Sequence, residues 1–459
     1  MKKAKELWKW IKKNRYLIII WTASTLFFVY QQTTGLSWDF AVYEMNAEYL
    51  CCEGHYFEWT RSPLAPLLMI VSSAFVLFNW NYVAYVYVII VSAIFGVGSV
   101  KLADSFGLDR KLFYALMLSP FALNMGVMAG TELLTLGLLM LFVAHVKEIK
   151  GALFVGLAGL ARYPSFLFLP LVFLQRNWKK IIASIAVVAI LVSPWLLYNE
   201  AKRDDPIYSL ENTYALTVKE RRERGVVDDP DPMHFLSVTG YYLPLLLAGI
   251  YLKWKDNWEE KDWVMLVIGG ITAVSYLRAP IKDSRYLFNL ILPVAYFSYY
   301  ALEGRHKKLF VGVLALNLII AGASFISFEN YPGVEESIDA TGNCMAVSNL
   351  WVPMNYYGKP AEAVAPNIST NVEEGNRVVI FKYVHNYDSY VDEEVLEDEP
   401  IVKETDEYVV FGDEDKCAPE RKADRSFIER EGELREIESC EDIFPSFVCI
   451  FSPDKHRYL

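Results

Sequence analysis

Charged residues are scarce in this sequence, and cysteines are few. Asp, Glu, Lys and Arg make up 22% of the 459 residues, hydrophobic residues make up 54%, and the six cysteines include no CxxC pair. The missing CxxC spacing argues against a zinc-ribbon site, and the missing internal repeat argues against transporters built from two similar halves. Apolar runs at 16–30 and 181–197 are long enough, or nearly so, to cross about 30 Å of hydrocarbon. We therefore expect a polytopic integral membrane protein, with the lipid bilayer as a partner.

Charge is divided unevenly along the chain. Residues 329–459 hold 30 acids and 12 bases, a net charge of −18, whereas residues 1–328 hold 25 acids and 32 bases, a net charge of +7. This asymmetry indicates a membrane domain over 1–328 and an acidic soluble domain over 329–459. The acidic domain disfavours nucleic acid as a partner.

The topology depends on two ambiguous segments. Residues 64–78 are short for a span and begin beside Pro63 and Pro66, and residues 151–174 are interrupted at Arg162-Tyr163-Pro164. If 64–78 lies along the external surface and 151–174 forms two short helices meeting near Arg162, five loops holding 14 Lys and Arg face the cytoplasm, as the positive-inside rule favours. If 64–78 crossed the membrane, the same loops would face outward. We adopt the first arrangement.

This arrangement predicts a mostly α-helical protein of the plasma membrane, with a cytoplasmic N-terminus and an extracytoplasmic C-terminal domain. Seven bases precede the first apolar run and no small-residue cleavage site follows Tyr30, so we expect the first span to be retained. The external parts are 31–80, 199–233, 278–285 and the residues after 328. The 20-residue criterion gives roughly eleven spans: 16–30, 82–100, 112–128, 131–146, 151–161, 164–175, 180–198, 234–252, 263–278, 286–302 and 309–328.

The acidic domain alternates short β-like runs with turn-rich segments, which is typical of a small α/β or mainly β domain. The runs are RVVIFKYV (377–384), EYVVFG (407–412) and SFVCIF (446–451). All six cysteines fall on the predicted external side, where an oxidising compartment permits disulfides. The sequence leaves open whether they are bridged and how they pair. They are Cys51, Cys52, Cys344, Cys417, Cys440 and Cys449.

Charged side chains inside or beside spans are costly in hydrocarbon, so they are candidates for function. Structural explanations compete with this reading: Glu132 suits a helix N-terminus, and Arg278 and Arg285 can snorkel to the interface. Their shared placement on the external face favours a functional role. The candidates are Asp39, Glu58 and Arg61 in the first loop, Glu132 at a span start, Arg162 at the helix break, and Arg278, Lys282 and Arg285 before the tenth span.

The first external loop also carries Glu44 and Glu48. They lie one helical turn apart, which places both on one face of any helix formed there. We expect them on the solvated face of a surface-lying helix. Asp39 lies apart from them, beside Trp38 and closer to the first span, and its position calls for a chemical reason.

A face that combines arginines and carboxylates beside lipid suits a substrate with a lipid tail and a phosphate head. Arginine binds phosphate oxygens in a bidentate manner, and a nearby carboxylate can serve as a general base on a hydroxyl. Sugar transfer needs both groups, because the leaving phosphate is stabilised while the attacking hydroxyl loses a proton. The residues alone indicate a phosphate-bearing amphiphile and a base, without identifying a sugar.

Six short motifs occur in an order that resembles one class of membrane enzymes. They are Trp38-Asp39 with Tyr43, YFEWTRSPLAPLL (56–68), Thr131-Glu132-Leu133, GLAGLARYPSFLFLP (156–170), SPWLLYNEAKRDDPIYS (193–209) and DSRYLFNLILP (283–293). In these motifs the chain resembles the GT-C-fold glycosyltransferases, which include protein O-mannosyltransferases, aminoarabinose lipid A transferases and archaeal and bacterial polyprenyl-phosphate-sugar transferases. It departs from them at Asp204-Asp205-Pro206, where Gly-Asp-Pro is usual, and at Arg61-Ser62-Pro63, where lipid A transferases have Lys before a proline.

The resemblance implies a GT-C-like fold and an inverting glycosyltransferase that takes a sugar from a polyprenyl or dolichyl phosphate at the external face. Asp39 is then the expected acceptor-side base, with Glu58 assisting or orienting it. A divalent metal ion is left open, with His55 and His234 as candidate ligands. Neither the sugar nor the acceptor, whether glycan, lipid or protein, follows from the sequence. The expected substrate-binding residues are Arg61, Glu132, Arg162, Arg278, Lys282, Arg285 and Tyr286.

Two other classes stay open. A transporter or flippase of a lipid-linked phosphate would carry similar charges, although it favours repeated halves and charges at mid-bilayer. A non-catalytic scaffold would use the acidic domain to bind partners. A polyprenyl phosphate bound beside Arg278 and Arg285 would favour the enzyme, whereas an open path to both faces would favour transport.

Overall fold

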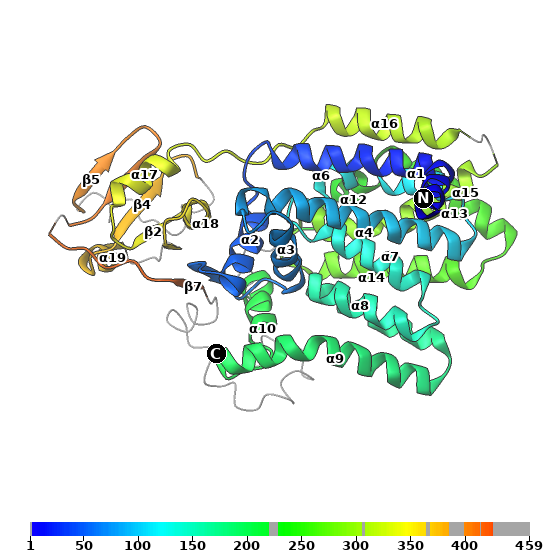
Figure 1. The fold of residues 1–459 in the computed structure, drawn as a ribbon, viewed down its shortest axis with the longest axis horizontal. Coiled ribbons are helices and arrows are strands. Elements are labelled where there is room, and N and C mark those ends of the chain that lie inside the picture. Colours follow the sequence, from blue (N-terminus) through cyan, green and yellow to red (C-terminus); the bar gives the residue numbers. More distant parts are fainter. Residues whose placement is uncertain are drawn as a thin grey trace. The chain divides into compact units, whose positions relative to one another are not determined.

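The computed structural model describes residues 2–219, 228–304, 308–363, 368–384, 399–413 and 415–425, and they form two compact units (Figure 1). The helical unit holds the residues up to Thr33 and Ser62–Ser327. The mixed unit holds Thr34–Arg61 together with the described residues from Phe328 to Arg425. The first part of the predicted external loop therefore folds with the C-terminal part of the chain.

The helical unit consists of α-helices and short helical turns. Its α-helices are α1 (Lys2–Gln32), α3 (Leu64–Phe75), α4 (Val83–Phe106), α5 (Arg110–Met117), α6 (Pro120–Met125), α7 (Glu132–Ala144), α8 (Ile149–Ala161), α9 (Trp178–Arg203), α10 (Tyr208–Tyr214), α12 (Pro232–Thr239), α13 (Leu243–Asp256), α14 (Glu260–Arg278), α15 (Ile291–Leu302) and α16 (Leu309–Ala323). The remaining turns are η1 (Trp80–Tyr82), η2 (Tyr163–Gln175), η3 (Ala215–Lys219), η4 (Gly240–Tyr242) and η5 (Ser284–Leu290).

Three helical stretches of the described residues are long and apolar enough to cross a membrane: Trp80–Phe106, Trp178–Arg203 and Pro232–Asp256. The expected number of roughly eleven spans is not confirmed, because several of the apolar runs form helices of 10–17 residues. One of these is α3, whose 12 residues reach only about 18 Å at 1.5 Å per residue. That length agrees with the expectation that 64–78 does not cross the bilayer.

The break expected near Arg162 is confirmed. Helix α8 ends at Ala161, Arg162 is extended, and the 3-10 segment η2 begins at Tyr163. Pro164 explains the break, since proline has no N–H with which to continue the hydrogen bonding of α8 and is tolerated in the first turn of the next helical segment. Arg162 therefore lies at a junction of two helical segments.

Close helix packing in this unit uses small and polar residues. A Cβ on Gly98 of α4 would lie 2.5 Å from the carbonyl oxygen of Gly137 of α7, so the two backbones meet where only glycine fits. Thr25 of α1 and Ser92 of α4 share a buried hydrogen bond of 2.6 Å. The amide of Asn317 in α16 donates to the carbonyl of Ala115 in α5. Figure 1 shows α1 and α16 side by side. The rings of Tyr16 in α1 and Phe310 in α16 pack edge to face, with their centroids 5.5 Å apart.

The mixed unit is an α/β structure. Its five-stranded sheet has the order β3-β2-β4-β6-β5, in which β2 is parallel to β3 and β4, and β6 is antiparallel to β4 and β5. The strands predicted within 377–384 and 407–412 are confirmed as β4 and β6, and 446–451 lies outside the described residues. The elements are α2 (Trp38–Cys51), β1 (Tyr56–Glu58), α17 (Val334–Thr341), β2 (Ala346–Ser348), α18 (Trp351–Tyr356), β3 (Ala361–Ala363), α19 (Ile368–Glu373), β4 (Arg377–Phe381), β5 (Ile401–Glu404), β6 (Tyr408–Phe411) and β7 (Ala423–Arg425).

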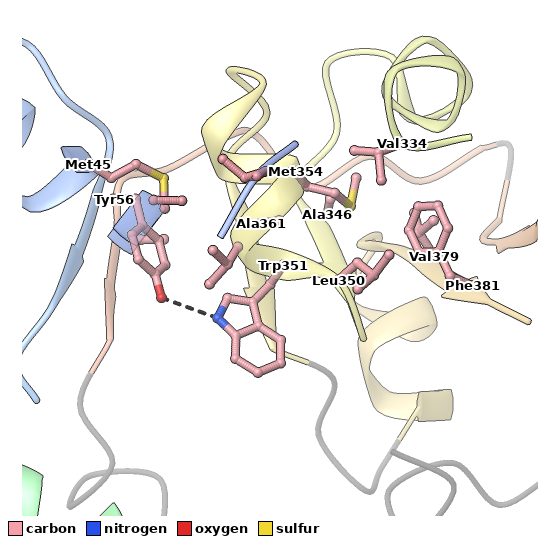
Figure 2. Close-up of a cluster of buried hydrophobic side chains, with 14 of the residues drawn as sticks. Met45, Tyr56, Val334, Ala346, Leu350, Trp351, Met354, Ala361, Val379 and Phe381 are labelled. Carbon is pink, nitrogen blue, oxygen red and sulfur yellow. Dashed lines mark hydrogen bonds between the residues drawn. The ribbon is translucent and has the colours of Figure 1, made fainter. Parts of the chain in front are cut away.

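One hydrophobic core joins the loop to this sheet. Met45 of α2 and Tyr56 of β1 pack in the same cluster as Leu350, Trp351 and residues of β2 and β4 (Figure 2). The indole Nε1 of Trp351 donates to the hydroxyl of Tyr56 over 3.2 Å. Strand β1 also pairs in parallel with β7. Burial of these aromatic side chains explains why residues 34–61 belong to this unit.

Two disulfides lie in the mixed unit. Cys344 pairs with Cys417, and the neighbours Cys51 and Cys52 pair with each other. Cys440 and Cys449 lie outside the described residues. The bridge between Cys344 and Cys417 joins two of the four cysteines in the acidic segment.

Candidate functional site

Arg61 lies between two carboxylates in the mixed unit. Its Nη1 is 2.9 Å from Oδ1 of Asp39, and its Nε is 3.0 Å from Oε1 of Glu58. The side chains of Arg61 and Asp39 are 16% and 25% exposed, whereas Glu58 is only 2% exposed. We call Asp39, Glu58 and Arg61 the ion triad. Arg61, which the sequence suggested as a substrate-binding residue, thus pairs with both carboxylates that it suggested as catalytic.

Local structure fixes both carboxylates of the ion triad. Asp39 is in the first turn of α2, where a negative charge is stabilised by the helix dipole. Glu58 ends β1, and its backbone N–H and carbonyl both bond the side chain of Asn46 in α2. The Glu58 carboxylate also accepts hydrogen bonds from the hydroxyls of Tyr56, over 2.9 Å, and Thr60, over 2.5 Å.

Electrostatics give the two carboxylates different roles. Burial by itself raises the pKa of Glu58, but Arg61, Arg425 and the hydroxyls of Thr60 and Tyr56 outweigh it and hold that pKa below its usual value. Burial lowers the pKa of Arg61, and Glu58 and Asp39 outweigh that effect and raise it. These contacts favour the ionised form of Glu58, which pairs with Arg61. Asp39 is the more exposed carboxylate and can meet a substrate hydroxyl.

A second group of predicted residues meets in the helical unit. Nη1 of Arg162, at the break between α8 and η2, is 3.1 Å from Oε1 of Glu132 in the first turn of α7. Glu132 is 1% exposed and Arg162 is 22% exposed. The guanidinium of Arg162 lies over the ring of Tyr286 in η5, 5.9 Å from its centroid. Glu132 is therefore stabilised both by the helix dipole at the start of α7 and by the ion pair with Arg162.

The remaining basic candidates lie near the end of α14. Nζ of Lys282 donates to the carbonyls of Tyr276, Leu277 and Ala279, so this lysine satisfies the last carbonyls of the helix. Nε of Arg285 is 2.7 Å from Oδ2 of Asp283. Arg278 is exposed in the last turn of α14. Lys282 has a structural task that the sequence did not reveal.

Neither candidate histidine lies in a set of metal ligands. Nδ1 of His234 is 2.8 Å from the hydroxyl of Tyr276, and its Nε2 is 3.9 Å from Asp231. His55 is half-buried, and burial lowers its pKa. Within the described ranges, no three His, Cys, Asp or Glu side chains are placed to hold one ion.

Sequence reasoning missed a hydrogen-bonded network beside Arg162. Nε1 of Trp195 in α9 donates to the hydroxyls of Tyr163 and Ser209 over 2.9 Å each, and those hydroxyls lie 2.5 Å apart. Tyr163 directly follows Arg162, so the network ties this junction to α9 and α10. All three residues lie in the quoted motifs, but only the folded chain brings them together.

The expectation for Glu44 is wrong. Its side chain is 6% exposed instead of solvated, and burial, followed by the charge of Glu48, raises its pKa to about 8. Glu48 is half-buried, and burial raises its pKa as well. The helical spacing was right, but α2 packs in a core that the loop alone does not reveal.

Comparison with solved structures identifies the architecture. ArnT from Cupriavidus metallidurans matches with a TM-score of 0.56 when bound to undecaprenyl phosphate and 0.58 in the apo state, at 10% and 9% identity, over 87% of this chain and 98% of ArnT in both cases. An oligosaccharyltransferase from Archaeoglobus fulgidus, in complex with Zn and sulfate, matches with a TM-score of 0.50 at 11% identity, over 79% of this chain and 68% of the enzyme.

No protein-family model matches the chain, and no curated protein matches it. At these identities, the structural similarity shows the fold. Both ArnT and the oligosaccharyltransferase have the GT-C fold of glycosyltransferases. The chain therefore has a GT-C-type fold, as the six motifs implied.

Proposed function

We propose that this protein is an inverting glycosyltransferase that moves a sugar from a polyprenyl or dolichyl phosphate to an acceptor hydroxyl at the external membrane face. The contact of Arg61 with Asp39 is the observation that carries the proposal. It puts a cation suited to a phosphate beside a partly exposed carboxylate suited to a hydroxyl proton. The similarity to ArnT, which was solved with undecaprenyl phosphate, supports a lipid phosphate as the leaving group.

In the proposed reaction, Asp39 takes the proton of the acceptor hydroxyl. The hydroxyl oxygen forms a bond to the anomeric carbon as the bond from that carbon to the phosphate oxygen breaks. The electron pair of the broken bond leaves with the lipid phosphate, and Arg61 stabilises its charge. Attack opposite the leaving group inverts the anomeric centre.

Glu58 is proposed as the positioning residue of this site. Its buried, ionised carboxylate pairs with Nε of Arg61, and Nη1 of the same guanidinium pairs with Asp39. A donor phosphate that binds Arg61 competes with Asp39 for that cation. Donor binding would thereby weaken the ion pair and leave the carboxylate of Asp39 free to accept the proton of the acceptor hydroxyl.

The helical unit supplies the other proposed donor-binding residues. Arg162 is one of them, and its guanidinium pairs with the buried carboxylate of Glu132 and lies over the ring of Tyr286. Arg278 and Arg285 are proposed to act on the same phosphate class. Lys282 is proposed to act mainly by holding the end of α14, because its ammonium already binds three carbonyls.

The membrane setting of this site is part of the same proposal. We place the protein in the plasma membrane with its N-terminus in the cytoplasm and the mixed unit outside. The basic loops identified in the sequence support this orientation. Labelling of an introduced cysteine at Glu362, an exposed position of the mixed unit, by an impermeant maleimide on intact cells tests it.

Purified protein incubated with a panel of lipid-phosphate sugars tests the donor class. We expect the wild type to bind at least one of them and Arg285→Ala to bind it more weakly, with an unchanged circular dichroism spectrum. Arg176→Ala is the matched control, because Arg176 is 79% exposed and pairs with Glu260. Equal affinity of Arg285→Ala and the wild type would reduce Arg285 to an interface anchor. No binding of any member of the panel would refute the donor class.

A further inference from the structure

Three partly exposed aromatic side chains gather in the mixed unit. Trp38, Tyr331 and Tyr383 each pack one side against the hydrophobic core and keep part of their surface accessible. The ring of Trp38 lies 6.5 Å from that of Tyr331. The hydroxyl of Tyr383 donates to the carbonyl of Pro332 over 3.0 Å, next to Tyr331. We call these three residues the aromatic patch.

Strand topology places the aromatic patch where ligands commonly bind in α/β structures. The chain runs from β2 to β3 on one side and then to β4 on the other side of β2, so the strand order reverses between β2 and β4. Ligands of open α/β sheets bind at the carboxyl ends of the strands at such a reversal. Tyr383 follows the end of β4 by two residues, and Trp351, which follows β2, packs edge-on against Trp38 at 4.8 Å.

A chain of direct contacts links the patch to the ion triad. Trp38 contacts Trp351, whose Nε1 donates to Tyr56. The hydroxyl of Tyr56 donates to Glu58, which binds Arg61, which in turn binds Asp39. Asp39 follows Trp38 in the first turn of α2. Neighbouring side chains on a helix do not face each other, so a ligand on Trp38 reaches Asp39 only if it extends around the first turn of α2.

The chemistry of the patch fits a saccharide. Sugar rings offer apolar C–H faces to flat aromatic rings, and their hydroxyls donate hydrogen bonds to carboxylates. Tyr331 donates to the exposed carboxylate of Glu329 over 2.8 Å, which puts an acceptor at the edge of the rings. The backbone bond from Leu36 to Glu329, 2.9 Å long, fixes the segment of Trp38 to that of Tyr331. Aromatic walls with a few polar groups are typical of small-ligand sites.

We propose that the acceptor carries a sugar ring that docks on Trp38, Tyr331 and Tyr383, with one of its hydroxyls directed to Asp39. This inference rests on the proposed function and narrows its acceptor to a saccharide. In the transfer, the docked sugar loses a hydroxyl proton to Asp39 and gains the bond to the donor's anomeric carbon. The lipid phosphate leaves with the electrons of the bond that breaks.

Saturation-transfer NMR on the full chain in lipid nanodiscs tests the docking without the donor. Nanodiscs are required because glycoside detergents would compete for the patch. The probes are methyl α-mannoside, methyl β-glucoside and maltotriose, with open-chain sorbitol as the polyol that lacks a ring face. We expect transfer to at least one ring probe and none to sorbitol. Transfer to no ring probe would overturn the proposal.

Variants at Tyr331 decide whether the aromatic ring is what binds. Tyr331→Leu keeps apolar volume against the core, and Tyr331→Phe keeps the ring. The matched control is Tyr357→Ala, which removes a 43% exposed tyrosine between α18 and β3 that is not part of the aromatic patch. We expect saccharide affinity to fall roughly two- to tenfold in Tyr331→Leu, and to be retained in Tyr331→Phe and Tyr357→Ala. Equal affinity in Tyr331→Leu and the wild type would overturn the proposal.

The two proposals fail separately. Saccharide binding that persists without turnover of any lipid-phosphate sugar would refute the proposed function alone. Turnover of such a donor by a protein that transfers no saturation to ring probes would refute the saccharide site alone. With an acceptor in hand, Tyr331→Leu should raise the acceptor KM and leave the donor KM unchanged.

Discussion

Replacing Glu58 by glutamine removes the inner charge of the ion triad while keeping the shape of the side chain. Glu58 is 2% exposed and Arg61 is 16% exposed, so the pair is largely out of water. Breaking a buried ion pair costs about 3–5 kcal/mol. Because Arg61 keeps Asp39 as a partner, we expect a loss of roughly 2–4 kcal/mol in the free energy of unfolding. The amide also turns an NH2 group toward the hydroxyls of Tyr56 and Thr60.

Thermal unfolding of the full chain, followed by tryptophan fluorescence, measures this loss. We expect the transition of the mixed unit to fall by roughly 10 °C. Glu362→Gln is the matched control, because Glu362 pairs with Arg421 at 42% and 66% exposure, and an exposed pair contributes about 0–1 kcal/mol. An equal shift in both variants, or none in Glu58→Gln, would refute the structural role of the triad.

The stability difference between the wild type and Glu58→Gln should also depend on pH. The pKa of Glu58 is lower in the folded protein than its ordinary value of 4.5. Its contribution to stability is therefore fully present above that value and is lost as the pH falls through the folded-state pKa. The gap between wild type and Glu58→Gln should narrow on acidification below pH 4.5. A gap that stays constant would show that charge is not the cause.

Three further predictions concern stability, each measured by denaturant or thermal unfolding of the full chain. The pKa of Glu44 rises from 4.5 to about 8 on folding, so its contribution to the free energy of unfolding is lost as the pH rises between those values. The loss is about 5 kcal/mol at most, and Glu44→Gln should flatten this fall in stability. A wild type whose stability does not fall over this pH range would contradict the burial argument. Asp204 ends α9 with φ at 53°, in the left-handed region that favours glycine, so Asp204→Gly should stabilise by up to about 1 kcal/mol. Destabilisation would contradict this. The bridge between Cys344 and Cys417 spans 73 residues, so replacing both cysteines by serine should lower the free energy of unfolding by about 4 kcal/mol through the entropy of the unfolded chain. An unchanged unfolding midpoint would argue against the bridge.

The sequence was informative wherever the signal was local. Pro164 after Tyr163 located the helix break, and the alternation within 377–384 and 407–412 located two strands. Asp39, Glu58 and Arg61 could be suggested as site residues because all three lie within one predicted external loop. Such features depend on neighbours along the chain.

Long-range packing was out of reach of the sequence. Glu44 looked solvated because its burial depends on a core shared with residues after Phe328. The carbonyl partners of Lys282 lie only three to six residues before it, but its contacts with them depend on how the chain turns back after α14. The count of roughly eleven spans is not confirmed, because hydropathy does not report where a helix ends, and several apolar runs form helices of only 10–17 residues.

The central claim is that Asp39 is the base of a lipid-phosphate-dependent sugar transfer. Its most direct test compares transfer rates of the wild type, Asp39→Asn and the control Asp104→Asn, using a donor that the wild type turns over. Asp104 is a matched control because it is a partly exposed aspartate in an ion pair, with Arg110. We expect Asp39→Asn to lose about 10²–10⁴-fold in rate while donor binding persists, and Asp104→Asn to keep wild-type transfer. Wild-type transfer by folded, membrane-inserted Asp39→Asn would contradict the account.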